Sequence, residues 1–350
     1  MGATGMTTGM ARPPVRWGIL GTGHIARTFT EDLLLLDDHV VAAAGSRTAG
    51  QAQAFAASYG IRRAYGSYEE LAADDSVDVV YVATPHPGHF GAARLCLLAG
   101  RAVLVEKPFT VTAGEAADLI ALAGERHLFA MEAMWTRFNP LIRQIRDLVA
   151  GGAIGTVTAI QADFAGAPAY EPTHRLWNPG LAGGALLDLG VYPIALGSML
   201  LGTPDAVHAL TATAPTGVDA NTAVIARYPG GAVGLYHCGL RAGSPTTATI
   251  TGTGGHISIG SPFYRPTSFT IHRGGAGQYD GTGQYDGTGP ETRTAVLQGH
   301  GYTYQAAEVA RCLRAGLTES PLMPLAETLA IMRTLDTARA EFSAVPLPAS

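Results

Sequence analysis

Apolar residues in the first third of the chain form short runs that alternate with amphipathic stretches. The apolar runs lie at 15–20, 39–45, 77–83, 102–105 and 128–131. The stretches between them place apolar residues on one helical face and lie at 24–36, 48–59, 88–99 and 112–126. The run 77–83 is almost continuously β-branched, which is typical of a strand buried on both faces. Alternating strands and helices with short connections predict a parallel, doubly wound sheet that ends near residue 133.

The second part of the chain has a different pattern. Helices are predicted at 137–150, 184–201, 303–316 and 325–342. Segments of alternating polarity lie at 156–164, 206–213, 222–228, 232–239, 247–251, 256–259 and 268–272. Strands that follow one another without helices predict a large, mostly antiparallel sheet with one face open to solvent or to a partner. The predicted fold class is therefore α/β in both halves.

Composition excludes several classes of protein. A length of 350 residues suits two domains, and a hydrophobic content of 47% supports a large core. Charged residues make up 15% and the net charge is −5, so we expect no nucleic-acid partner. The cysteines Cys96, Cys238 and Cys312 are far apart and indicate neither a disulfide framework nor a thiolate metal site.

We expect a soluble, cytoplasmic protein with no membrane segment, because no apolar stretch approaches the roughly 18 residues of a membrane span. Residues 1–14 lack the pattern of a signal peptide and are interpreted as a disordered leader. The hexapeptide Gly-Gln-Tyr-Asp-Gly-Thr occurs twice within 277–288. Two copies are too few for a stacked calcium-binding repeat, so a solvated loop is expected.

A glycine motif follows the first predicted strand. Gly21-Thr22-Gly23-His24-Ile25-Ala26 fits G-x-G-x-x-A between a strand and a helix. The first glycine makes a tight turn, the second lets the backbone approach a pyrophosphate, and the alanine lets helix and strand pack closely. The helix N-terminus adds N–H donors and a positive dipole end. We predict that these residues bind a dinucleotide; the alternative is a plain strand–helix turn.

The end of the second strand indicates which dinucleotide binds. An NAD site places Asp or Glu there to hold the ribose 2′-hydroxyl. This chain has Ser46 and Arg47 instead, a hydroxyl and a planar cation suited to a phosphate. The sequence therefore favours NADP over NAD. The alternative for Arg47 is a solvated loop residue.

Several stretches match one family together. They are Ala83-Thr-Pro-His-Pro-Gly-His89, Glu106-Lys-Pro108, Met131-Glu-Ala-Met-Trp-Thr-Arg-Phe-Asn-Pro140, Gly183-Gly-Ala-Leu-Leu-Asp-Leu-Gly-Val-Tyr192 and the tail from Leu317 to Leu329. With these motifs the chain resembles the glucose–fructose oxidoreductase, inositol dehydrogenase and MocA (Gfo/Idh/MocA) family over residues 15–342. Within it, the chain is similar to the branch of dimeric dihydrodiol dehydrogenases and NADP-dependent D-xylose dehydrogenases.

The resemblance implies a Rossmann domain over 15–133 and a substrate-binding and oligomerisation domain over 134–350. Helix 325–342 is expected to pack back on the Rossmann domain. The large open sheet of such a second domain commonly forms a subunit interface, so a homodimer or higher homo-oligomer is expected. The resemblance also places Thr84, Pro85, His86, His89 and Glu106 at the nicotinamide ribose of the cofactor.

The predicted catalytic residues are Lys107, Asp188 and Tyr192. Lys107 follows a strand, where ligands bind in doubly wound sheets, and the family assigns it contacts to the reacting hydroxyl and the ribose, with Pro108 often cis. Asp188 and Tyr192 lie four apart in a predicted helix and share a face. A nearby lysine cation favours a phenolate and lowers the pKa of the phenol, so Lys107 and Tyr192 are sufficient to accept a hydroxyl proton. Asp188 would orient the substrate or the lysine; the alternative for Tyr192 is a core tyrosine.

Predicted substrate contacts come from the boundary between the domains and from a following loop. They are Trp135, Arg137, Phe138, Arg175 and Trp177. Such boundaries are favoured pocket sites, and a loop able to cover the pocket would exclude water. For each residue, packing or capping is the alternative.

The sequence indicates no metal site, because the pair His86 and His89 has no evident third ligand. We therefore predict an NADP-dependent oxidoreductase acting on an alcohol of a sugar, such as D-xylose, or on a trans-dihydrodiol, in either direction. One alternative is a glycosidase that uses bound NAD transiently. Another is a non-catalytic NADP-sensing regulator, which would need neither Lys107 nor Tyr192.

Overall fold

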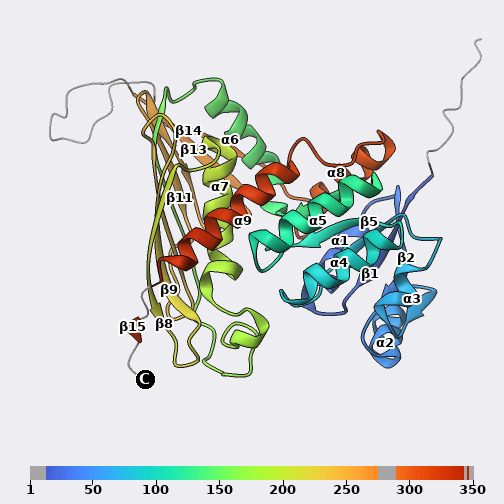
Figure 1. Cartoon of the computed structure of the whole chain (residues 1–350). Helices are drawn as coiled ribbons and strands as arrows, with labels where there is room; N and C mark the ends of the chain where they lie inside the picture. Colours follow the sequence, from blue (N-terminus) through green and yellow to red (C-terminus); the bar gives the residue numbers. More distant parts are fainter. Residues whose placement is uncertain (1–12, 275–288, 343–344, 347–350) are drawn as a thin grey trace, which may run out of the picture.

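The computed structural model describes residues 13–274, 289–342 and 345–346, and these form two α/β halves side by side (Figure 1). The first half contains a six-stranded sheet in the order β3-β2-β1-β4-β5-β6, with every neighbouring pair parallel. Its strands are β1 (Val15–Leu20), β2 (His39–Gly45), β3 (Arg63–Tyr65), β4 (Val79–Val82), β5 (Ala102–Glu106) and β6 (Ala130–Ala133). The doubly wound prediction is confirmed.

Helices cover both faces of this sheet, and local sequence explains where they begin. They are α1 (His24–Leu33), α2 (Ala49–Tyr59), α3 (Tyr68–Ala72), α4 (Gly88–Leu98) and α5 (Ala113–Arg126). Thr48 and Ser67 cap α2 and α3, and Thr112 with Glu115 forms a capping box at α5. The strand order reverses between β1 and β4, and doubly wound sheets bind ligands at such a reversal, beside the carboxyl ends of the strands.

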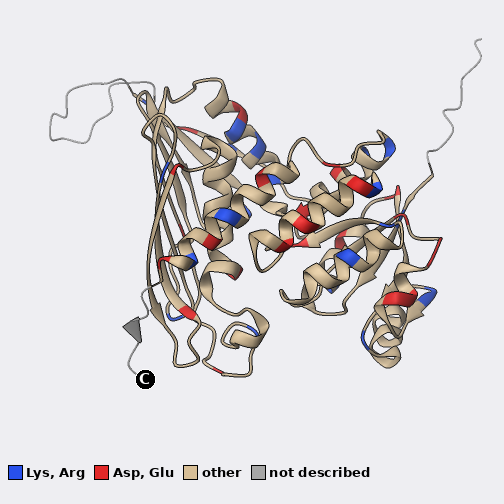
Figure 2. Cartoon of the chain, viewed as in Figure 1, with Lys and Arg blue, Asp and Glu red and all other residues tan. Residues whose placement is uncertain are grey.

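The second half is built on a nine-stranded sheet in the order β14-β13-β12-β11-β7-β10-β9-β8-β15. Its strands are β7 (Val157–Ala165), β8 (Ala206–Thr213), β9 (Asp219–Arg227), β10 (Val233–Gly239), β11 (Ala248–Gly252), β12 (Gly255–Ile259), β13 (Ser268–Arg273), β14 (Glu291–Thr294) and β15 (Val345–Pro346). Only the pairs β7/β10 and β8/β15 are parallel, so the predicted mostly antiparallel sheet is confirmed. Its strands carry few charged residues (Figure 2).

One face of the large sheet packs on helices and the other is open. Helices α6 (Pro140–Ala150), α7 (Val191–Leu201) and α9 (Leu325–Ala340) lie on the side that faces the first half, and no helix of the described residues covers the opposite side (Figure 1). Leu210, Ile225 and Leu235 are exposed on this open face, and Ile225 pairs with Leu235 across neighbouring strands.

Two helices differ from their predicted bounds. The predicted helix 137–150 starts later, because Asn139 caps α6 with its side chain and Pro140 occupies the first turn, while Trp135–Phe138 forms a separate 3₁₀ turn, η1. The predicted helix 184–201 contains a π turn, η3 (Leu186–Gly190), before α7. A short 3₁₀ turn, η2 (Pro179–Leu181), precedes both.

The C-terminal helices connect the two halves. On α9, the Asp336 carboxylate accepts the N–H of Ala113 at 2.8 Å, and Arg339 donates to the carbonyl of Val111 at 2.7 Å, so α9 docks at the start of α5. Helix α8 (Thr303–Arg314) packs against α1 and η1.

The expectation that no apolar segment is long enough to span a membrane was wrong. The segment Pro179–Leu201 is long and apolar enough to cross a membrane. However, 78% of its apolar 18-residue stretch is buried inside the structure, as in the core helix of a globular domain. Most of the predicted leader and the predicted hexapeptide loop lie outside the described residues.

Candidate active site

The glycine turn lies between three strand ends. Gly21 has a φ of +100° and donates its N–H to the carbonyl of Gly45 at 2.9 Å, and a Cβ at Gly21 would meet the carbonyl oxygen of Ala83 at 2.6 Å. Only glycine therefore fits here. Gly23 caps α1 without a side-chain partner and has open space around it. The first N–H groups of α1 thus remain available to an anion.

This turn opens into a cavity of about 540 Å³ whose lining comes from both halves. The structure brings together sixteen of the predicted site residues: Gly21, Thr22, Gly23, His24, Ile25, Ser46, Arg47, Thr84, Pro85, His86, His89, Glu106, Lys107, Arg175, Asp188 and Tyr192. These residues come from the carboxyl ends of four strands, β1, β2, β4 and β5, and from the segment 175–192, so the fold builds one site from positions that are far apart in sequence.

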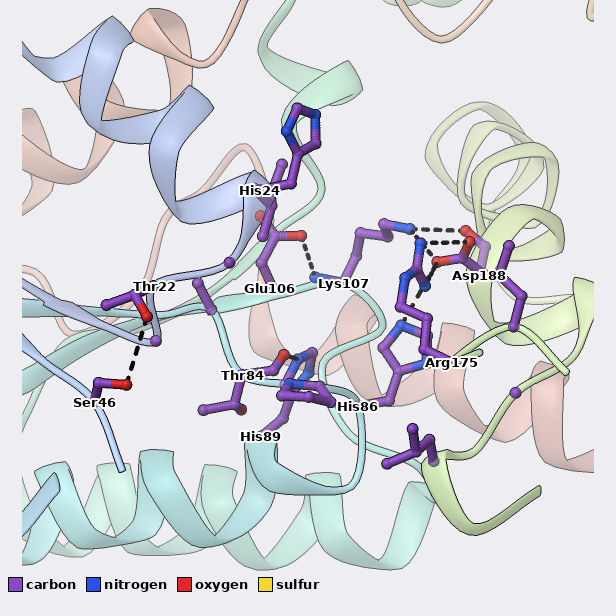
Figure 3. Close-up of a pocket in the computed structure, with 18 of the residues that line it drawn as sticks. Thr22, His24, Ser46, Thr84, His86, His89, Glu106, Lys107, Arg175 and Asp188 are labelled. Atoms are coloured by element: carbon purple, nitrogen blue, oxygen red, sulfur yellow. Dashed lines mark hydrogen bonds and ion pairs between the residues drawn. The ribbon is translucent and has the colours of Figure 1, made fainter. Parts of the chain in front are cut away.

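One end of the cavity contains Ser46 and Arg47 at the end of β2. The Ser46 hydroxyl donates to Gln51 Oε1 at 3.0 Å and lies 3.4 Å from the Thr22 hydroxyl (Figure 3). Arg47 is exposed and forms no ion pair with any residue in the described ranges. An unpaired guanidinium beside an ordered hydroxyl suits a phosphate monoester, which supports the expected role of these residues.

At the other end, Lys107 Nζ donates to the main-chain carbonyl of Asp188 at 2.7 Å and lies 3.1 Å from its carboxylate (Figure 3). Arg175 donates to both carboxylate oxygens at 3.0 and 3.3 Å, and His86 Nε2 lies 3.6 Å away. Burial opposes ionisation of Asp188, but Lys107, His86 and Arg175 hold the pKa of this carboxyl well below its usual range. Asp188 is therefore an anion that fixes the position of Lys107.

Lys107 is the only lysine in the sequence, and every other basic side chain with a fixed charge is arginine. An arginine would supply the same charge as a planar guanidinium, whereas a lysine supplies it as a compact ammonium with three donors. Lys107 lies at the carboxyl end of β5, before a cis peptide bond to Pro108. Doubly wound sheets bind their ligands at the carboxyl ends of the strands.

Tyr192 lies beside this pair at the start of α7. Lys107 Nζ is 4.9 Å from the centroid of its ring, and the Tyr192 hydroxyl accepts a hydrogen bond from Trp135 Nε1 at 3.0 Å. Burial and the neighbouring Glu106 raise the pKa of Tyr192 well above its usual value, although the bond from Trp135 opposes this shift. The expectation that Lys107 makes this phenol acidic is thus corrected, because the ammonium faces the ring and Asp188 rather than the phenol oxygen.

The π turn η3 explains how Asp188 and Tyr192 reach the same cavity. A π turn widens the helix locally and is frequent at functional sites. The Leu186 N–H at its start is held by the Asp219 carboxylate at 2.7 Å. At its end, a Cβ on Gly190 would meet Cys238 Sγ at 2.9 Å, so the glycine lets this turn approach β10 closely.

Two buried side chains, Glu106 and His89, connect the segments that are predicted to bind the cofactor. Glu106 accepts from the Tyr81 hydroxyl and from the N–H of Lys107, and burial raises the pKa of Glu106 to about 7. His89 lies between two carbonyl oxygens, 2.8 Å from that of Thr84 and 2.8 Å from that of Pro108. Burial lowers the pKa of His89 to about 3. A neutral imidazole has one N–H, so His89 donates to one of these carbonyl oxygens and packs against the other, between the two loops.

Four predicted substrate residues do not line the cavity. Trp135 bonds Tyr192, Arg137 forms a two-pronged ion pair with Glu327 of α9, Phe138 is core, and Trp177 donates to the carbonyl of Ala169 at 2.9 Å. The physical reason for the first three is that η1 packs against α8 and pairs with α9, whereas Trp177 is held by its own loop. For these four residues the structure favours the packing alternative, and of the predicted substrate set only Arg175 lines the cavity.

Eight lining residues were not predicted as site residues, although Ala83, Gly183 and Gly184 belong to the family motifs. They are Gln51, Tyr68, Ala83, Leu176, Leu181, Gly183, Gly184 and Tyr302. Gln51 follows the end of β2 closely, so a search of that segment for side chains near Arg47 could have found it, whereas Tyr68 starts α3, beyond α2 and β3. Tyr302 lies 110 residues beyond Tyr192 in no motif, and only the tertiary structure places it.

Comparisons with known proteins agree with this geometry. Residues 15–133 match the model of an oxidoreductase family with an NAD-binding Rossmann fold, and residues 142–258 match a GFO/IDH/MocA C-terminal domain. The chain is 38% identical over 329 residues to trans-1,2-dihydrobenzene-1,2-diol dehydrogenase of Bos taurus, covering 93% of this chain and 96% of that protein. It is 39% identical over 359 residues to D-xylose 1-dehydrogenase (NADP(+)) of Hypocrea jecorina, covering 93% and 91%.

Among solved structures, the chain resembles KijD10, a 3-ketoreductase from Actinomadura kijaniata in complex with NADP and TDP-benzene. The TM-score is 0.82 at 26% identity, and the match covers 96% of this chain and 100% of that one. An aldose-aldose oxidoreductase from Caulobacter crescentus shares the fold, with a TM-score of 0.82 at 22% identity.

Proposed function

Because this chain belongs to the GFO/IDH/MocA oxidoreductase family, we propose that it transfers hydride between NADP and an alcohol carbon of an aldose such as D-xylose, or of a trans-dihydrodiol. It is a dehydrogenase that acts on CH–OH groups. The observation that carries the choice of chemistry is the single cavity that joins the glycine turn to Lys107, Asp188 and Tyr192.

The residues at the nucleotide end fit NADP. The open space beside Gly23, where a Cβ would meet no atom, the uncapped start of α1 and the unpaired Arg47 would hold the pyrophosphate and the 2′-phosphate. Nicotinamide, when bound, accepts or supplies the hydride. The segment 84–89 and Glu106 would lie against its ribose.

Tyr192 and Lys107 handle the proton of the substrate hydroxyl. At neutral pH the Tyr192 phenol is neutral, because burial raises its pKa, and it can donate a proton to a carbonyl oxygen during reduction. Oxidation needs Tyr192 as the phenolate to accept this proton, while the Lys107 ammonium stabilises the developing charge on the substrate oxygen. The oxidative kcat is therefore expected to rise with pH, and the reductive kcat to fall.

Asp188 and Arg175 set the charge around the reacting atoms. Asp188 holds Lys107 in place, and Arg175 reaches the same carboxylate from the loop that precedes η3. When substrate enters, this loop can exclude water from the cavity.

A panel of aldoses, inositols and trans-diols with NADP⁺ or NAD⁺, followed by the absorbance of the reduced cofactor, tests this proposal. Oxidation of a sugar or diol with preference for NADP⁺ is the expected result. Cleavage of a glycoside without net NADPH formation would identify the glycosidase alternative. Tight NADPH binding with no turnover on any substrate in either direction would identify the regulator.

The single lysine allows a second test. A lysine-selective acylating reagent can modify only one side chain, Lys107, besides the chain terminus. Modification of Lys107 should abolish turnover. Bound NADP⁺ should protect Lys107 from modification, as measured by peptide mass, and should preserve the activity. Equal labelling with and without NADP⁺ would remove Lys107 from the cofactor site.

We also propose a cytoplasmic homodimer formed through the open face of the large sheet. The exposed row of Leu210, Ile225 and Leu235 supports association of two copies. Light scattering of Ile225→Glu should then show a smaller mass than that of the parent chain, and an unchanged mass would refute this surface. The three buried free cysteines suit a reducing compartment, which cell fractionation can check.

A further inference from the structure

The ring of Tyr302 is held on two sides in the wall of the cavity. It stacks on Trp135 with centroids 4.5 Å apart and an interplanar angle of 27°. Phe29 of α1 meets it edge-on, with centroids 6.4 Å apart. Side chains packed in this way have little freedom to turn, so the direction of the hydroxyl is fixed before any ligand arrives.

The backbone of Tyr302 is fixed by one buried carboxylate. Asp32, which is 1% exposed near the end of α1, accepts the N–H of His300 at 2.7 Å, of Tyr302 at 2.7 Å and of Thr303 at 3.2 Å. The same helix begins at the glycine turn. The helix that would bind the pyrophosphate therefore also sets the position of Tyr302, although the two segments are about 270 residues apart.

The hydroxyl of Tyr302 has no hydrogen-bond partner within the described ranges, and the residue is 7% exposed and lines the cavity. Other buried phenols are paired: Tyr81 donates to Glu106, and Tyr192 accepts from Trp135. A buried phenol normally has a partner. The partner of Tyr302 therefore enters from the cavity.

The position of Tyr302 relative to Tyr192 indicates what that partner is. The indole of Trp135 touches both, since its N–H bonds the Tyr192 oxygen and its ring stacks on Tyr302. The two phenols thus border one space. Burial raises the pKa of Tyr302 above its usual value, and the neighbouring Tyr192 and Glu106 add to this shift. The hydroxyl therefore stays neutral and can both donate and accept a hydrogen bond.

We propose that Tyr302 hydrogen-bonds a second substrate hydroxyl, on the carbon next to the one that is oxidised, and so selects vicinal diols and sugars over simple alcohols. This inference rests on the proposed function and adds the structural feature that aldoses and trans-dihydrodiols share. Both carry a hydroxyl on the neighbouring carbon, and a site built to bond that group rejects substrates without it.

Tyr302→Phe removes the hydroxyl and keeps the ring that stacks on Trp135. We expect kcat/KM to fall roughly five- to tenfold for D-xylose and trans-cyclohexane-1,2-diol, the loss of one neutral hydrogen bond. The 2-deoxy analogue of D-xylose and cyclohexanol should show the same kcat/KM in the variant and the parent. The Kd of NADPH, measured by fluorescence, should not change.

Tyr304→Phe is the matched control, because the Tyr304 hydroxyl accepts the N–H of Gln298 at 3.1 Å and does not line the cavity. It should leave all four substrates unchanged. Equal losses on substrates with and without the second hydroxyl would overturn the inference, as would a change confined to NADPH binding or no change at all. A parent enzyme that binds NADPH but converts no alcohol or carbonyl would instead refute the proposed function and the inference with it.

Discussion

Replacing Trp135 by Phe removes one hydrogen-bond donor from the oxygen of Tyr192 and keeps an aromatic ring against Tyr302. The indole N–H lies 3.0 Å from the phenol oxygen, and Trp135 is 5% exposed, so water does not readily replace the lost donor. This substitution tests whether Tyr192 carries the proton without touching Tyr192 itself.

The magnitude follows from the change in charge at the acceptor. A neutral hydrogen bond contributes about 1 kcal/mol net, and one to a charged group about 1.5–3 kcal/mol. The donor therefore favours the phenolate over the phenol by about 0.5–2 kcal/mol, the middle of which corresponds to roughly one pKa unit. Trp135→Phe should raise the pKa of Tyr192 by that amount, because the bond from Trp135 acts to lower it.

The assay is the pH profile of oxidative kcat on the best alcohol substrate at saturating NADP⁺. On the rising part of the profile, kcat should fall roughly tenfold and the profile should shift by about one unit to higher pH. Trp177→Phe is the matched control, since that indole is equally buried and donates only to a main-chain carbonyl. An unshifted profile in Trp135→Phe, or an equal shift in the control, would refute Tyr192 as the group that titrates.

Three further predictions test other parts of the site. Tyr192→Phe should lower kcat by roughly 10²–10⁴ with little change in the KM for NADP⁺, since only the proton-carrying oxygen is removed; near-normal steady-state turnover would exclude its role. Arg47→Ala should raise the KM for NADP⁺ roughly tenfold or more and leave that for NAD⁺ unchanged, because a charge-assisted phosphate contact is lost; equal effects on both cofactors would contradict this. Burial raises the pKa of Glu132 to about 7, above the value near 4.3 expected in the unfolded chain. The folded state then binds more protons, so this group costs stability as pH rises from 5 to 8, and Glu132→Gln should gain in Tm relative to the parent over that range; a constant difference in calorimetry would refute it.

Local sequence was sufficient for most of the first half. An apolar run such as 77–83 is stable only when both faces of the strand are buried, and the glycine motif binds a dinucleotide only between a strand and a helix. The hydrophobic pattern and the position of the motif therefore indicated the same fold. The short strand β3 was missed, since its three residues Arg63–Tyr65 give too little periodicity to distinguish them from a loop. The start of α6 was misplaced, because the Asn139 cap and Pro140 separate it from η1.

The residues that the sequence predicts as catalytic lie together in the structure, but their electrostatics could not be predicted from the sequence. Lys107 and Tyr192 do line one cavity, yet the charge of Lys107 is directed to Asp188, and burial dominates the pKa of Tyr192. A pKa depends on the distance and direction of every neighbouring charge, and sequence spacing supplies neither. For the same reason, Trp135 could be recognised as a residue of the site region but not as a hydrogen-bond donor to Tyr192.

The sequence by itself determined the two-part α/β architecture, the dinucleotide turn at Gly21 and the position of the only lysine, because each depends on residues close together in the chain. Only the tertiary structure decided which side chains share the cavity. Asp32 fixes Tyr302 across about 270 residues, and the π turn η3 turns Asp188 toward Lys107. Such contacts arise from packing between elements, and packing is set by the whole fold rather than by any local pattern of residues.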